Sequence, residues 1–338
     1  MPKKKSPKPE FYRTFMKEGF FPNSNKITRF EESENYWIFK TGARIYKVKK
    51  KADVQSAVPL EEIFCNEISY QIQQHSPELD CQVFTIKQDN NEFAIDWDGS
   101  IAGKPLYYAV AMNQLSDRGF LSNIVSKGKL TESNLDKICA HLVSYHQKTK
   151  VSESKDDGSP DALTSKLENL YYQSKKYLGV TITKAMIDMT LRPLEKYLAD
   201  NRKAFLKRMK QGYIRVVQGC FIPRKIHIAK DSVNVLGKTS DPLKDRYNDV
   251  SADIADLTME LQFAEQDKMS EYFIDKYRQL SGDKEFTTVL PAYQALRCLH
   301  LGLKHSIQTA DLEGKDSEQV KQLAIKYYEQ TIEVVRGL

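Results

Sequence analysis

The chain has 338 residues and a net charge of +6, with 41% hydrophobic and 28% charged residues, which suits a globular protein of two domains or lobes. No apolar run reaches the roughly 18 residues that a membrane-spanning helix needs, and the basic N-terminus lacks the apolar segment of a signal peptide. Five widely spaced cysteines without a C-x-x-C pair argue against a zinc site or a disulfide scaffold. We therefore expect a reducing, cytoplasmic setting.

Residues 1–25 open with a cluster of basic side chains, Lys3, Lys4, Lys5 and Lys8, and are interpreted as a basic, disordered tail. An alternative is that the tail makes an electrostatic contact with nucleic acid, an anionic membrane or an acidic partner. No aromatic residue interleaves these lysines, as stacking on bases would require, so the solvated tail is the preferred interpretation.

Residues 26–112 have the pattern of a small sheet with one inserted helix. Residues 36–50 predict a β-hairpin that turns at Thr41-Gly42. Residues 59–74 have apolar side chains at helical spacing. Three further strands are expected at residues 81–87, 92–97 and 105–112. This part of the chain is therefore predicted to form a β-rich lobe.

Residues 113–338 are predominantly helical in pattern. The helix from Thr131 is expected to open with a capping box in which Thr131 or Ser133 precedes later acids. Residues 151–160 are the most linker-like stretch and are expected to form a flexible loop. Residues 215–228 read as a strand, a short loop and a second strand, followed by a short strand at 232–236. Further helices are expected at residues 162–211, 249–264, 266–281, 290–308 and 316–336.

Four stretches in this order resemble the aminoglycoside phosphotransferase-like kinases: WIFKTGARIYKVKK, FCNEISYQI, DVSADIADLTMELQF and PAYQALRCL. The resemblance implies an α+β, two-lobed protein kinase-like fold with a nucleotide-binding cleft between the lobes. In that family a strand ending in Y-K-x-K-K carries the phosphate-binding lysine, which here is Lys47. Lys49 is the second candidate because it shares a strand face with Lys47. Glu67, on the inserted helix, is the implied carboxylate partner.

The first chemical segment of the family is altered in this chain. In the family it reads H-G-D with an Asn five residues after the Asp, and these residues orient the accepting hydroxyl and help to hold magnesium. This chain has Gln218, Gly219 and Cys220 at that place, and Lys225 where the Asn would stand. A thiol could act as a nucleophile, but no adjacent activator is evident, so an inert, buried Cys220 is preferred.

The second chemical segment, which carries a metal-binding aspartate in the family, also departs from the pattern. Counting back from DVSADIADL places Gly237 at the metal-binding position and Ser240 at the second acid. A shift of this alignment by a few residues would instead bring Asp241 or Asp245 into the site. The preferred alignment predicts no metal site.

These departures predict a catalytically inactive kinase-like protein, a pseudokinase, that acts as a binding or regulatory module. Lys225, with Arg224 and Lys238 beside the altered positions, suggests that any ligand is an anion held without metal, such as a nucleotide, a phosphorylated metabolite or an acidic side chain of a protein partner. For Lys225 itself, the preferred alternative is that it points into solvent or that a neighbouring loop fills the cleft. Two alternatives stay open. One is an active phosphotransferase on a small molecule or protein that uses a displaced acid such as Asp241. The other is a basic scaffold that binds nucleic acid or anionic lipid.

Overall fold

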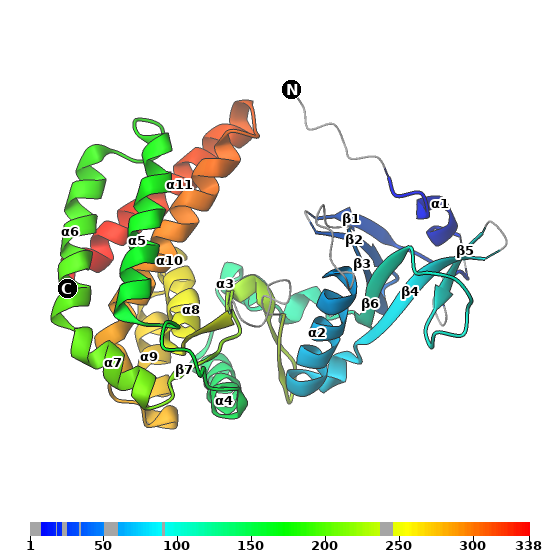
Figure 1. The fold of residues 1–338 in the computed structure, drawn as a ribbon, viewed down its shortest axis with the longest axis horizontal. Helices are drawn as coiled ribbons and strands as arrows, with labels where there is room; N and C mark the ends of the chain where they lie inside the picture. The colour runs from blue at the N-terminus through cyan, green and yellow to red at the C-terminus, as the bar shows by residue number, and fades with distance from the viewer. Residues whose placement is uncertain are drawn as a thin grey trace.

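The computed structural model shows two lobes, one built around a sheet and one built of helices (Figure 1). It describes residues 8–17, 19–21, 26–33, 35–50, 60–89, 92–236 and 246–338. The expectations for Gly237, Lys238, Ser240, Asp241 and Asp245, and for the first lysines of the chain, lie outside these described residues. Within the described ranges, no helix is long and apolar enough to cross a membrane. The predicted α+β two-lobe architecture is confirmed.

The N-terminal lobe is an antiparallel sheet whose strands lie in the order β1-β2-β3-β6-β4-β5. The hairpin predicted around Thr41-Gly42 is confirmed, since Ile38 of one strand lies opposite Lys47 of the next and Gly42 adopts a φ of +90° in the turn. The strands are β1 (Arg29–Glu32), β2 (Tyr36–Lys40), β3 (Arg44–Lys49), β4 (Gln82–Asp89), β5 (Glu92–Asp96) and β6 (Tyr107–Asn113).

The helix α2 (Leu60–His75) covers one face of this sheet, with Cys65, Ile68 and Ile72 buried against Val110 and Met112. Alternation along β6 sends the neighbouring side chains, at positions 109 and 111, to the opposite face. The inserted helix and the strands around it were therefore predicted correctly from their periodicities.

The opposite face of the sheet is covered by a segment that the sequence pattern assigns to a tail. A short helix, α1 (Tyr12–Phe15), and the residues around it bury Phe11, Phe15 and Phe21 among the aromatic side chains of the sheet. The Phe11 ring lies 4.8 Å from that of Tyr107 and 5.5 Å from that of Trp37. The interpretation of residues 8–17 and 19–21 as a disordered tail is therefore wrong. These residues pack on the sheet because their apolar side chains remove from water a sheet face that would otherwise be exposed.

The C-terminal lobe is a helical bundle centred on the largely buried helices α8 and α10, and its last two helices, α10 and α11, run side by side (Figure 1). Thr131 caps α4 as expected, but its partner in the capping box is Asn134 and not an acid. The helices are α3 (Leu121–Ser126), α4 (Glu132–Lys148), α5 (Pro160–Ser174), α6 (Lys184–Asp200), α7 (Arg202–Lys210), α8 (Ser251–Phe263), α9 (Asp267–Ser281), α10 (Phe286–Thr309) and α11 (Gly314–Arg336).

Two short antiparallel ribbons lie in the C-terminal lobe and hold the loop between β7 and β8. The strand β7 (Ile214–Val216) pairs with β10 (Tyr247–Asp249), and β8 (Ile226–Ile228) pairs with β9 (Val233–Val235). Residue 151, in the stretch expected to be a flexible loop, forms an isolated bridge with residue 215 of β7. The strands β7 and β8, with the loop between them, confirm the strand–loop–strand pattern predicted for residues 215–228.

Candidate functional site

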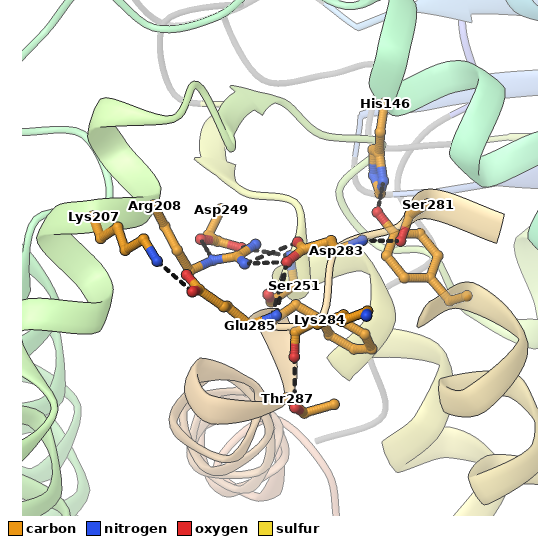
Figure 2. A network of polar contacts seen from close by, with 12 residues as sticks. His146, Lys207, Arg208, Asp249, Ser251, Ser281, Asp283, Lys284, Glu285 and Thr287 are labelled. Atoms are coloured by element: carbon orange, nitrogen blue, oxygen red, sulfur yellow. Dashed lines mark hydrogen bonds and ion pairs between the residues drawn. The ribbon is translucent and has the colours of Figure 1, made fainter. Parts of the chain in front are cut away.

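A buried ion-pair network fixes the start of α8 (Figure 2). Arg208 is fully buried, and its Nε and Nη2 donate to the two carboxylate oxygens of Asp249 at 2.6 and 2.9 Å, while Nη1 donates to Asp283 at 2.8 and 2.9 Å. Asp249 Oδ1 also accepts the backbone N–H of Ser251 at 2.8 Å. The first turn of α8 is thereby held against α7 and the segment before α10.

Two carboxylates of α8, three residues apart and so on one helix face, hold the loop after β7. Asp253 accepts the backbone N–H of Gln218 at 2.8 Å and that of Gly219 at 2.9 Å. Asp256 accepts the N–H of Phe221 at 2.9 Å. The stretch DVSADIADL carried the resemblance to the kinase family, but these loop-anchoring roles become visible only in the structure.

Asp253 and Asp256 differ in their surroundings. Asp253 is also bonded to His146 Nε2 at 3.0 Å, and His146 Nδ1 lies 2.9 Å from the hydroxyl of Tyr277. Burial raises the pKa of Asp256 to about 6, against the opposing effect of the guanidinium of Arg297. Both carboxylates are thus engaged in holding the loop.

The loop presents a thiol at the position where the resemblance implies a carboxylate. Cys220 is half-buried, in contrast to the buried Cys220 that was expected, and its φ of +63° lies in the left-handed region that non-glycine residues rarely adopt. The Arg297 guanidinium is close enough to form a hydrogen bond with its sulfur. Gln218 is buried, and its Nε2 has no hydrogen-bond partner among the described residues.

A cavity of about 200 Å³ lies between the lobes, at the place where the resemblance predicts a nucleotide. Lys47 of β3 lines it from the N-terminal lobe, Gln114 from the connection between the lobes, and Phe120 and Leu236 from the C-terminal lobe. Burial, together with the positive charges of Lys225 and then Lys40, lowers the pKa of Lys47 to about 8. The positive charge of Lys225 thus acts on Lys47, although Lys225 does not itself line this cavity.

The predicted ion pair between Lys47 and Glu67 does not form. Glu67 Oε1 instead lies 3.7 Å from Nη1 of Arg246, whose side chain is only 3% exposed. A buried guanidinium keeps its charge and requires a nearby carboxylate, whereas a buried amine can lose its proton. For this reason Glu67 pairs with Arg246 and not with Lys47. Arg246 follows directly on the undescribed residues 237–245, and no pattern in the sequence pointed to it.

The other two predicted binding residues, Lys49 and Lys225, do not line the cavity between the lobes. Lys49 shares the strand face with Lys47, but its Nζ donates to Asn35 Oδ1 at 3.3 Å and lies 5.2 Å from the centre of the Phe64 ring on α2. Lys225 is half-buried at the end of a short helical turn, and burial lowers its pKa, with Arg224 and Lys304 acting in the same direction.

Strand β1 contributes a carboxylate, Glu31, to the lining of the same cavity. Protein kinases keep a glycine-rich loop over the nucleotide phosphates, whereas the sequence of the turn between β1 and β2, Glu32-Ser33-Glu34-Asn35, has no glycine. Glu31 lines the cavity and is paired with Lys40 at 2.8 Å. In the described part of the chain, no group of three or more His, Cys, Asp or Glu residues could hold a metal ion.

The fold is that of the kinase-like enzymes. No protein-family model and no curated protein matches the sequence. A thermostable mutant of the aminoglycoside phosphotransferase APH(4)-Ia is similar with a TM-score of 0.55 at 12% identity, covering 92% of this chain and 95% of that chain. The ADP-bound aminoglycoside phosphotransferase APH(2'')-Ib gives 0.51 at 12% identity, covering 93% and 95%. A choline/ethanolamine kinase family protein from Mesorhizobium loti also gives 0.51 at 12% identity, covering 92% and 93%.

Proposed function

We propose that this protein is a catalytically inactive member of the kinase-like fold, a pseudokinase, that acts as a binding or regulatory module. The observation that carries the proposal is the thiol of Cys220, which lies half-buried in the loop after β7 while Asp253 and Asp256 are bound to the backbone of that loop. An ammonium at position 225 repels a magnesium ion where the related kinases offer it an amide oxygen.

The chemistry of phosphoryl transfer supports the same conclusion. The protein contributes positioning and electrostatic relief to such a reaction, and magnesium supplies much of the charge neutralisation. Cys220 offers a thiol in place of the carboxylate that orients the accepting hydroxyl, while Asp253 and Asp256 are engaged with the backbone of the loop. An active phosphotransferase would need an acid from residues 237–245, such as Asp241.

The experiment is an assay of ATP hydrolysis and phosphoryl transfer with magnesium and with manganese. We expect no turnover above that of a sample without protein. Turnover that is lost in Asp241→Ala and kept in Asp231→Ala, an exposed acid in the turn between β8 and β9, would overturn the proposal. It would show that a displaced carboxylate holds the metal.

The proposal extends to the ligand of the interlobe cavity, which we expect to be an anion bound without metal, for example a nucleotide or an acidic side chain of a partner protein. Lys47 lines this cavity and the positive charge of Lys225 acts on it, so an anion bound beside Lys47 would offset that repulsion. Thermal stabilisation by ADP in EDTA that disappears in Lys225→Ala would support this ligand. Stabilisation that requires magnesium would contradict it. The free cysteines suit a reducing, cytoplasmic compartment.

A further inference from the structure

A second cavity, of about 250 Å³, lies within the C-terminal lobe and beside the loop that carries Cys220. Its walls come from that loop and from β10, α5, α8 and α10. Its lysine and arginine residues are Lys166, Arg224, Arg246, Arg297 and Lys304. The acidic residues of the lining are Asp253 and Asp256, so positive charges outnumber negative ones. The cavity therefore has the electrostatic character of an anion site.

The buried guanidinium of Arg246 has hydrogen-bonding capacity that the described residues leave unused. Its Nη2 donates to Val217 O at 3.0 Å and to the hydroxyl of Tyr145 at 3.2 Å. Its Nε has no hydrogen-bond partner among the described residues, and its Nη1 has only the ion pair with Glu67 at 3.7 Å. A buried donor without an acceptor is unfavourable, so an anion that enters the cavity gains a bond that the protein alone does not make.

The guanidinium of Arg297 supplies a second cation deep in the cavity. Its Nε lies 3.0 Å from Asp256 Oδ1, its Nη2 lies 3.9 Å from Glu260 Oε1, and the side chain is 14% exposed. Asp256 also accepts the backbone N–H of Phe221, so Arg297 is held in place beside the loop. At the rim, Arg224 and Lys304 are exposed to solvent.

We propose that this cavity binds a small phosphate monoester. Planar guanidinium groups match the oxygens of a phosphate in geometry and charge. Two of them at one site favour a phosphate over an anion that can contact only one of them. The volume is below the range of about 300 to 1,000 Å³ that is common for drug-sized ligands, which fits a phosphate on a small body. The inference goes beyond the proposed function, because its residues belong to the C-terminal lobe and require neither ATP nor a metal.

Cys220 provides a local reporter for this cavity. It lines the cavity, and the other four cysteines are buried. Labelling of the full-length protein by N-ethylmaleimide, followed by mass spectrometry, therefore reports access to the site. In EDTA, we expect O-phosphoserine or inorganic phosphate at ten times its dissociation constant to slow the labelling of Cys220 roughly tenfold. Ethanolamine, a cation of small size, is expected to leave the rate unchanged.

Variants separate this cavity from the interlobe cavity. Arg224→Glu combined with Lys304→Glu changes two exposed rim residues and is expected to weaken protection by phosphate at least tenfold. Arg192→Glu combined with Lys203→Glu makes the same charge change at exposed positions on α6 and α7, outside the cavity lining, and should leave protection intact. Lys47→Met should also leave it intact, because Lys47 lines the other cavity.

Three results would overturn the proposal. One is equal protection by phosphate in the rim variant and the wild type. Another is protection by ethanolamine in place of phosphate. The third is loss of protection in Lys47→Met alone, which would assign the anion to the interlobe cavity. Since the readout needs no turnover, its failure is distinct from the detection of ATP hydrolysis, which bears only on the proposed function.

Discussion

Replacing Lys47 by methionine tests the electrostatics of the interlobe cavity. The methionine side chain has a similar length and carries no charge, so the variant removes the ammonium without leaving a large void. Burial and the charge of Lys225 lower the pKa of Lys47 from 10.5 to about 8. At about 1.4 kcal/mol per pKa unit, the buried ammonium costs at most about 3.5 kcal/mol of folding free energy at pH 7.

The sign of the pH dependence follows from proton binding. Between pH 8 and pH 10.5 the unfolded chain keeps the proton on residue 47 while the folded protein releases it. The free energy of unfolding of the wild type therefore increases as pH rises from 8 to 10.5, and this increase is lost again as pH falls to 8. Lys47→Met lacks this titrating group. Its free energy of unfolding therefore exceeds that of the wild type by the largest amount at pH 7, and the difference vanishes near pH 10.5.

The measurement is the melting temperature of the ligand-free protein in EDTA, at pH 7 and at pH 10. A protein of 338 residues has an unfolding entropy of about 0.7 kcal/mol/K, so Lys47→Met should melt up to about 5 °C higher than the wild type at pH 7. Lys104→Met, at an exposed position of the same lobe, should change stability by no more than about 0.5 kcal/mol. A lower melting temperature for Lys47→Met at pH 7 would refute the reasoning, since it would mean that the ammonium has a stabilising partner.

Three further substitutions test the packing that positions the sites, each by the free energy of unfolding in urea. Phe11→Ala should cost about 3–5 kcal/mol because the ring is fully buried against the sheet; a change below 1 kcal/mol would restore the view of this segment as a tail. Arg208→Met should cost about 3–5 kcal/mol by leaving two buried carboxylates unpaired, whereas Lys207→Met, at a more exposed ion pair, should cost under about 1 kcal/mol. Gly119→Ala should cost about 1–3 kcal/mol, since its methyl group would collide with the imidazole ring of His227; an effect that persists in His227→Ala would exclude that collision as the cause.

Local patterns in the sequence were sufficient for most elements of the fold. The Thr41-Gly42 turn between two apolar runs predicted the β2–β3 hairpin, because a tight turn and strand alternation are properties of neighbouring residues. Helical spacing in residues 249–264 and 316–336 likewise predicted α8 and α11. The order of these elements, together with four short stretches, was enough to predict a kinase-like fold.

The predicted tail shows where local patterns fail. Residues 1–10 are rich in lysine and proline, and the short aromatic segment after them has no period long enough to identify a helix. Phe11 and Phe15 become core residues only because strands from residues 29–113 present an uncovered apolar face to them. The high density of phenylalanines was the sequence feature that indicated burial. Whether these side chains are buried, however, depends on a surface formed by residues elsewhere in the chain.

Only the tertiary structure decided which charged groups meet. The sequence assigned Glu67 to Lys47, but folding places Glu67 beside Arg246 and brings Lys47 under the positive charge of Lys225. These partners are separated by more than 170 residues in the chain, and no periodicity encodes such a distance. The basic cavity beside Cys220 has the same origin, since α5, α8 and α10 contribute its residues from three separate segments. Sequence patterns report the conformation of neighbouring residues, whereas the charge of a site is the sum over residues that packing brings together.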